Sequence, residues 1–147
     1  HHGNGTQDIF YDRPDVLTVS VHADPSRFYP FFWGYAHERG TGAGEGANLN
    51  LPIPVGSGDD VYVAAIESAA KTIAAFTPGM LVVALGLDAS ADDPFGGAKV
   101  TADGFRRAGE AIARMGLPTL FVQEGGYLSD RLGPNLTAVL GGFEATA

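Results

Sequence analysis

Three short apolar runs along the 147-residue chain predict buried β-strands. They comprise residues 16–21, 80–85 and 117–122, and turn-forming or polar residues flank each of them. The runs are apolar throughout rather than alternating, which is the pattern of strands that helices cover on both faces. None of the runs is long enough to cross a bilayer, so the pattern indicates a folded domain with no membrane segment.

Apolar residues at helical spacing follow each of these strands. The first helix is expected to begin with Asp59 as its N-cap and to stop at residues 77–79, which read Thr-Pro-Gly. A second helix is expected from a Thr101 cap to Gly116, and a third over residues 134–140. The apolar face of the first helix comprises Tyr62, Ile66, Ala69, Ile73 and Phe76.

A long loop is expected from His22 to about Asn50, because four glycines fall within residues 40–46 and argue against a regular element. The order of elements is then strand, long loop, helix, strand, loop, helix, strand, loop, helix. That order predicts an α/β domain with a parallel sheet. Ligands of such sheets bind beyond the carboxyl ends of the strands, so the loops that begin at His22, Gly86 and Gln123 become the candidate site.

The composition excludes some kinds of site and some classes of partner. The chain is 45% hydrophobic and 18% charged, as globular proteins are, and it has no cysteine, which excludes disulfides and thiolate metal sites. Its net charge is −8 and its nine basic residues are scattered, which argues against direct nucleic-acid binding and favours a cationic partner such as an amine. No signal-peptide pattern begins the chain, and we expect a cytoplasmic protein.

Metal-ligating and acidic side chains stand at the candidate loops. Asp88 follows the second strand, Tyr127 follows the third, and His1 and His2 precede the first. Histidine and aspartate together suit zinc, and three protein ligands with one open position make a catalytic site. Simpler interpretations remain open at this point. The two histidines also fit a purification-tag remnant, Asp88 a turn cap, and Tyr127 a buried tyrosine with a satisfied hydroxyl.

Four motifs in order, HHGNGTQDIFY, FYP, GLDASADDPFGG and QEGGYL, resemble the histone deacetylase superfamily. The resemblance is to its bacterial class II and acetylpolyamine amidohydrolase-like branch, and it assigns the histidine pair to the protein itself. It implies an arginase/deacetylase-like three-layer fold with a parallel sheet. It also implies that residues 1–147 are the C-terminal part of one catalytic domain whose N-terminal part is missing.

The resemblance assigns a zinc ion to His1 and Asp88. The family's third ligand is an aspartate two residues before the histidine pair, and its tandem catalytic histidines come earlier still, so both would precede residue 1. Asn4 matches the residue that orients the second of those histidines. Tyr127 matches the catalytic tyrosine, whose hydroxyl would stabilise the oxyanion, while Gly125 and Gly126 would let the backbone turn it into the site.

The resemblance also implies a substrate tunnel with an aromatic wall. Phe28 and Tyr29 match that wall, Phe95 lies near the mouth, and Gly125 and Gly126 line it. Phe95 stands where relatives tuned to polyamines have a glutamate, which weakens a polyamine-gatekeeper role without removing polyamines as substrates. A neighbouring aromatic group fits a hydrophobic plug equally well; it comprises Phe31, Phe32 and Trp33.

Two monovalent-cation sites, suited to potassium, are implied as well. The inner one would use the His1 carbonyl, the Ser20 hydroxyl and the Val21 carbonyl. The outer one would use the carbonyls of Phe10, Arg13 and Val16. Oxygen donors suit a hard cation of this kind.

We therefore expect part of a zinc-dependent amidohydrolase that removes an acyl group, such as acetyl, from lysine side chains or polyamines, with the 147-residue chain inactive alone. One alternative is a truncated, inactive deacetylase that serves only as a binding module. A weaker one is a ureohydrolase-like enzyme with two manganese ions, which needs more clustered acidic and histidine ligands than the single Asp88 loop offers. Homo-oligomerisation stays open.

Overall fold

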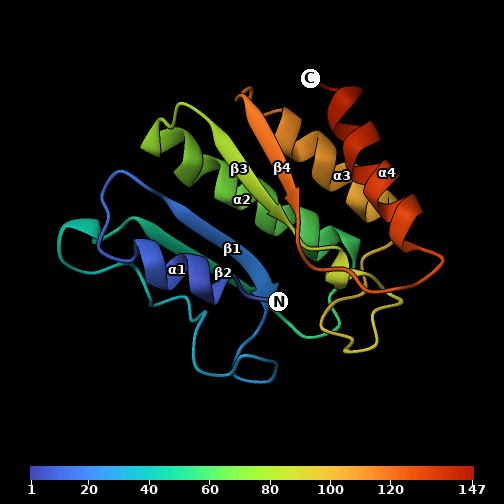
Figure 1. Cartoon of the computed structure of the whole chain (residues 1–147), viewed down its shortest axis with the longest axis horizontal. Coiled ribbons are helices and arrows are strands. Elements are labelled where there is room, and N and C mark those ends of the chain that lie inside the picture. The colour runs from blue at the N-terminus through green and yellow to red at the C-terminus, as the bar shows by residue number, and fades with distance from the viewer.

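The computed structural model describes residues 1–147 and shows an α/β chain (Figure 1). The three predicted strands are present as β1, β3 and β4, and the three predicted helices as α2, α3 and α4, with bounds a few residues from those expected. The left-handed backbone of Thr77 (φ 54°) ends α2 where the Thr-Pro-Gly stop predicted it. The strands span Thr18–Ala23, Leu81–Leu85 and Thr119–Gln123, and the helices span Asp59–Phe76, Ala102–Ala113 and Leu132–Glu144.

Two elements were not predicted. A short helix, α1, spans Asn4–Phe10, and a strand, β2, spans Asn48–Ile53. The expected loop over residues 22–50 is therefore wrong at both ends, since β1 runs on to Ala23 and β2 begins at Asn48. β2 alternates asparagine with leucine. Asparagine is depleted in strands, so the composition of this segment argued against a strand, although its alternation of polar and apolar residues is typical of one. The glycine-rich stretch holds one short 3₁₀ turn, Gly42–Gly44.

The strands form two parallel pairs rather than one continuous sheet. β1 pairs with β2, with Thr18 opposite Asn48, and β3 pairs with β4, with Leu81 opposite Thr119. All four strands run in the same direction, so their carboxyl ends lie on one side of the molecule (Figure 1). The predicted parallel arrangement is thus confirmed within each pair.

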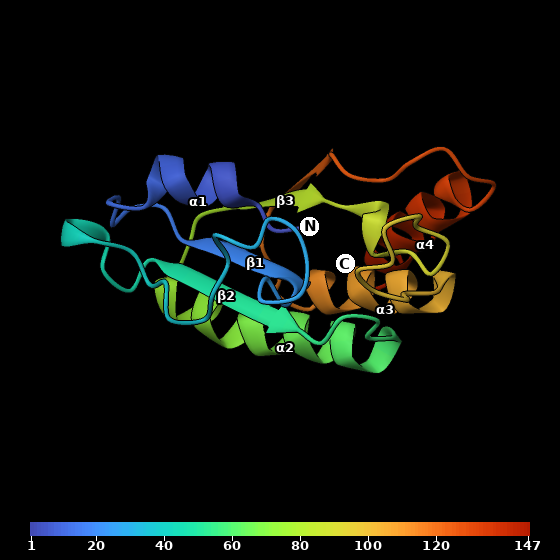
Figure 2. The ribbon, with the colours of Figure 1, turned by 90° about the horizontal axis from the view of Figure 1, so that it is seen from below.

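The helices lie on different faces of the two pairs. α2 packs against β1, β2 and α3, while α1 lies on the opposite face of β1 and β2 (Figure 2). A core of Leu85, Phe105 and Val139 joins β3 to α3 and α4. The other face of β3 and β4 is bare: Val82 is 56% exposed and Leu120 52%. The expectation that helices cover both faces of every strand is therefore wrong for this pair. None of the helices has the length and apolarity that a membrane crossing requires.

The N-cap residue of α3 also forms hydrogen bonds with the first residue of α2. Thr101 caps α3 as predicted, accepting a hydrogen bond from the N–H of Gly104 at 3.4 Å. Asp59 is not the cap of α2, which is Gly58. The Asp59 carboxylate instead accepts hydrogen bonds from the N–H and hydroxyl of Thr101, both at 2.7 Å, because α2 and α3 begin side by side.

Candidate active site

The candidate site lies at the carboxyl ends of the strands, where the N-terminus also lies (Figure 1). Asp88 sits in a 3₁₀ turn, Leu87–Ala89, directly after β3, and is buried. The backbone nitrogen of His1 lies 2.9 Å from Asp88 Oδ2. The imidazole Nδ1 of His1 contacts the same carboxylate oxygen. Residues 87 positions apart in sequence therefore bring one nitrogen and one oxygen donor together.

The two donor atoms are of kinds that zinc binds, but two protein ligands are fewer than a zinc site needs. Imidazole nitrogen and carboxylate oxygen are common zinc ligands. The chain places no group of three His, Cys, Asp or Glu side chains together where a metal could bind. His1 Nδ1 and Asp88 Oδ2 are also closer than the roughly 3–4 Å that two ligands of one tetrahedral zinc would show. In this structure the two side chains are in direct contact, and they are two of the three ligands that the resemblance predicts.

Two glycines leave room for the Asp88 carboxylate. A Cβ atom at Gly125 would come within 2.7 Å of the Asp88 Cγ, and one at Gly86 would come within 2.5 Å of its Oδ1. Gly125 follows β4, and its carbonyl also accepts the Leu87 N–H at 3.0 Å. The loops after β3 and β4 therefore pack so closely around Asp88 that neither glycine can carry a side chain without moving it.

Aromatic rings surround His1. Its imidazole stacks on Phe28, with ring centroids 5.5 Å apart, and meets Tyr29 and Phe95 edge to face at 5.9 and 5.8 Å. Phe95 in turn meets Tyr127 edge to face at 5.9 Å. The structure thus gathers the three residues expected to form a tunnel wall around the expected zinc ligand. The remaining aromatic residues of the loop, Phe31, Phe32 and Trp33, are exposed.

Tyr127 lies at the same end of the strands as Asp88 but lines a different cavity. Asp88 borders the large cavity, whereas Tyr127 borders a small one beside Asp93. Gly126 has a φ of 122°, and a Cβ there would come within 2.9 Å of Leu87, so the turn before Tyr127 requires glycine. Asp88 and Tyr127 follow neighbouring strands but do not line one cavity in this structure. The ring of Phe95 stands between His1 and Tyr127.

A buried chain of hydrogen bonds that sequence analysis did not anticipate begins at His2. His2 Nδ1 lies 3.0 Å from Ser20 Oγ, which lies 2.8 Å from His22 Nδ1, and His22 Nε2 lies 2.8 Å from the Gly34 carbonyl. Burial, and secondarily the nearby His22, lowers the pKa of His2 to about 4. Burial likewise lowers the pKa of His22. Both rings are therefore neutral at pH 7, and each carries one N–H.

The direction of this chain follows from the Gly34 carbonyl, which can only accept. His22 must donate from Nε2, so its Nδ1 accepts the Ser20 hydroxyl proton, and Ser20 Oγ accepts the Nδ1 proton of His2. His2 Nε2 is then an unprotonated acceptor, and it is buried without a partner. The residue next to His1 is thus held in one orientation by side chains of β1.

The chain of hydrogen bonds continues into a buried polar cluster. Gly34 donates its N–H to Glu38 Oε2 at 2.8 Å, and the same oxygen accepts from Gln7 Nε2 at 2.7 Å. Gln7 Oε1 accepts from the amides of Asn50 and Asn48 at 2.8 and 3.3 Å. These contacts tie α1, the long loop and β2 together. The signal in the sequence was the Asn-Leu-Asn-Leu alternation, which places both asparagines on one face of a strand.

The remaining predicted site residues are more scattered. Asn4 is exposed at the start of α1. Of the six residues expected to bind monovalent cations, five border the large cavity and one, Arg13, does not; the five are His1, Phe10, Val16, Ser20 and Val21. Arg13 instead pairs with Asp15, its Nε 2.7 Å from Oδ1. The roles of all these residues remain predictions.

Comparison with known proteins adds independent information. The histone deacetylase domain family matches residues 1–143. The chain belongs to the histone deacetylase family. It is 52% identical over 147 residues to Acetylpolyamine amidohydrolase 1 of Pseudomonas aeruginosa, covering 100% of this chain and 42% of the relative. It is 45% identical to Acetylpolyamine amidohydrolase of Mycoplana ramosa, covering 97% of this chain and 42% of that one.

Solved structures of this family share the fold. The chain superposes on acetylpolyamine aminohydrolase from Burkholderia pseudomallei with a TM-score of 0.95 at 46% identity, covering 99% of this chain and 43% of that chain. It superposes on the histone deacetylase Clr3 with a TM-score of 0.90 at 34% identity, covering 100% and 26%. The predicted deacetylase-like fold is thus confirmed, and the chain spans less than half the length of these relatives.

Proposed function

We propose that the whole protein is a zinc-dependent amidohydrolase that removes an acetyl group from a primary-amine substrate, either an acetylpolyamine or an acetyl-lysine side chain. The observation that carries the proposal is the meeting of His1 Nδ1 and Asp88 Oδ2 inside a ring of aromatic side chains. Relatives named as acetylpolyamine amidohydrolases, at 52% to 45% identity over nearly the whole chain, support the same conclusion.

His1 and Asp88 would be two of the ligands, and the third, with the general-base histidines, would come from the rest of the protein. Bound there, zinc would supply Lewis-acid polarisation of the amide carbonyl and of the attacking water. Gly125 and Gly86 keep the Asp88 carboxylate in place, since any side chain at either position would displace it. The network through Ser20 and His22 fixes the backbone next to His1.

Tyr127 would donate its hydroxyl proton in a hydrogen bond to the oxyanion that forms at the amide carbon. It is half-exposed and follows the glycine turn at Gly126. Phe28, Tyr29 and Phe95 would exclude water from the acyl chain and from the extended methylenes of the amine. The net charge of −8 favours cationic amine substrates over nucleic acid. Potassium at the carbonyl-lined positions belongs to the same proposal.

The experiment is metal analysis of the whole protein combined with a panel of acylated amines, acetylpolyamines and acetyl-lysine peptides. The Tyr127→Phe variant should lose about 100- to 1,000-fold in kcat with little change in KM and with its zinc content unchanged. Tyr11→Phe is the matched control, because Tyr11 lies away from the site in the turn after α1, and it should keep full activity. Near wild-type kcat for Tyr127→Phe would assign that residue to packing instead.

A further inference from the structure

Two consecutive glycines, Gly96 and Gly97, follow Phe95 in the loop after β3, and they differ in what requires a glycine. Gly96 has a φ of 66°, and a Cβ atom there would meet nothing within 4 Å. Gly97 has no positive φ, so its backbone conformation does not require glycine. A Cβ atom at Gly97 would instead lie 2.8 Å from Cζ and 2.9 Å from Cε1 of Phe28. The ring of Phe28 thus occupies the space that a side chain at position 97 would take.

The contact is with the face of the Phe28 ring. The Cβ position at Gly97 is also 3.4 Å from Cε2 of that ring. A point in the plane of the ring that is as close to Cζ and Cε1 would lie farther than that from Cε2, so the Cβ position lies above the plane. The imidazole of His1 stacks on the same ring, with centroids 5.5 Å apart and planes 28° apart. The ring is therefore packed against two partners, the backbone of Gly97 and the imidazole of His1.

The backbone of Gly97 is held in place by the segment that leads into α2. The Gly97 carbonyl accepts the N–H of Gly56 at 2.9 Å, and Lys99 donates its N–H to the Ser57 carbonyl at 2.8 Å. Ala98 forms a parallel bridge with Ser57. Gly97 and Ala98 are both buried. This backbone cannot shift to make room for a side chain at position 97 without breaking these hydrogen bonds.

The loop that carries Phe28 is fixed at both ends. Asp24 donates its N–H to the carbonyl of Ile53, at the end of β2, at 2.8 Å. At the other end, Gly34 donates its N–H to the buried Glu38 carboxylate at 2.8 Å. The part of this region that moves most easily is the Phe28 side chain itself, which turns about two bonds. A larger residue at position 97 would therefore turn the ring out of its present place.

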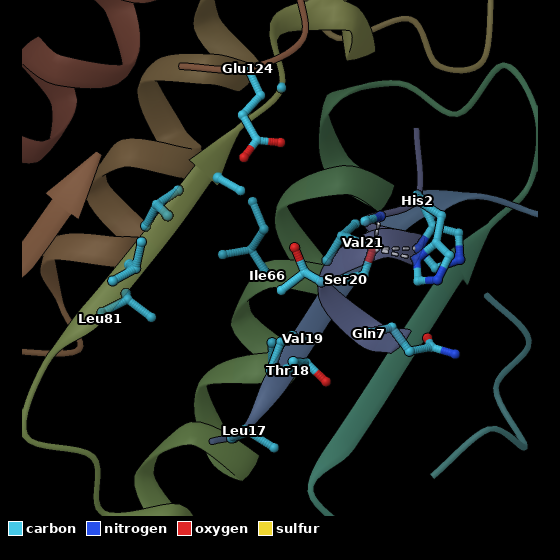
Figure 3. A pocket seen from close by; sticks show the side chains of 18 of the residues that line it. His2, Gln7, Leu17, Thr18, Val19, Ser20, Val21, Ile66, Leu81 and Glu124 are labelled. Atoms are coloured by element: carbon cyan, nitrogen blue, oxygen red, sulfur yellow. Dashed lines mark hydrogen bonds between the residues drawn. The ribbon is translucent and has the colours of Figure 1, made fainter. Parts of the chain in front are cut away.

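The Phe28 ring borders the space next to the donor pair. Phe28 and Gly97 line the large cavity, of about 950 Å³, together with His1 and Asp88. Figure 3 shows this cavity from close by, with Glu124, directly after β4, among the residues that line it. The direction of the Phe28 ring therefore sets the shape of the cavity beside the expected zinc ligands.

We propose that Gly97 is a positioning residue: because it has no side chain, the Phe28 ring packs flat on its backbone and stays in the aromatic wall that would contact the acylated amine. The inference rests on the proposed function. Phe28 supplies neither a metal ligand nor a proton, so displacing its ring weakens binding of the substrate in the ground state and in the transition state alike. Such a loss raises KM and leaves kcat almost unchanged.

The first measurement compares KM and kcat of variants of the whole protein, with an acetylated diamine and an acetyl-lysine peptide as substrates. Gly97→Ala should raise KM at least about 10-fold, as one misfitting methylene does in an apolar pocket, while kcat stays within about threefold and the zinc content is unchanged. Gly58→Ala is the matched control, because a Cβ there meets nothing within 4 Å and its backbone is extended (φ −90°, ψ −167°). It should leave both constants unchanged.

A double-mutant cycle shows whether Gly97 acts through Phe28. Phe28→Ala removes the ring and should raise KM by itself. Gly97→Ala should then add nothing, so the double variant should match Phe28→Ala within about twofold. If the two effects multiply in the double variant, Gly97 acts by another route and the inference is wrong.

Thermal unfolding of the same variants separates positioning from packing and does not depend on catalysis. Gly97→Ala should lower the Tm when Phe28 is present and not when it is absent. If the single variant does not fold, the double variant should fold, and a double variant that also fails contradicts the inference. A lower Tm with an unchanged KM would assign Gly97 to packing alone and overturn the positioning role.

The proposed function fails separately, if the unchanged whole protein hydrolyses no acylated amine. Coupled Tm values of the Gly97 and Phe28 variants would then still uphold the contact between these two residues, and uncoupled values would overturn it.

Discussion

Gly142→Ala probes the closest helix contact of the fold, and its cost can be worked from the structure. A Cβ at Gly142 of α4 would overlap the carbonyl oxygen of Arg106 on α3 and lie 2.9 Å from its carbonyl carbon. The obstacle is backbone, so the helices must separate. Gly109 on α3 faces the backbone of α4 equally closely, since a Cβ there would lie 2.9 Å from the nitrogen of Phe143, which leaves no slack on the other side. Overpacking of this kind costs about 1–3 kcal/mol, against a helix-propensity gain of at most about 1 kcal/mol.

Gly141→Ala is the matched control, because Gly141 is the adjacent residue of the same helix and a Cβ added there would meet no atom within 4 Å. It should stabilise the chain by about 0.5–1 kcal/mol. Since both variants gain the same helix propensity, they should differ by the overpacking cost of roughly 1–3 kcal/mol, or about 3–10 °C in Tm for a chain of this size. Thermal unfolding followed by circular dichroism measures the difference. Equal Tm values for the two would refute the close α3–α4 crossing.

Three further predictions concern the site. Gly125→Ala should displace the Asp88 carboxylate, weaken zinc binding and lower the activity of the whole protein about 100-fold. Gly133→Ala is the control, because there is open space around Gly133 and neither effect is expected. Equal zinc affinity of the two variants would contradict this prediction. Glu38→Gln should destabilise the chain by about 1–3 kcal/mol in chemical denaturation, because its buried oxygen accepts three hydrogen bonds, and exposed Glu45→Gln should be neutral. The 147-residue chain alone should not hydrolyse acetyl-lysine, since it brings together only two ligands, and measurable zinc-dependent turnover would contradict this.

The strands and helices that could be predicted are those whose own residue pattern indicates which positions are buried. Residues 81–85 are all apolar and include two β-branched valines, and α2 carries an apolar stripe at helical spacing. Strand β2 was missed because two of its six residues are asparagines whose binding partners lie elsewhere in the chain. Asn48 and Asn50 are buried against Gln7 and Glu38, so their polarity reflects long-range partners and not a loop.

The candidate site was predictable in its members and less so in its arrangement. His1, Asp88 and the aromatic residues were identified by motif, and the structure brings them together. The position of Tyr127 beside a different cavity from Asp88 could not be foreseen, because it depends on how two loops lie across each other. The orientation of His2 could not be predicted either, since it depends, through Ser20 and His22, on the backbone carbonyl of Gly34, and a glycine has no side chain that would indicate such a contact.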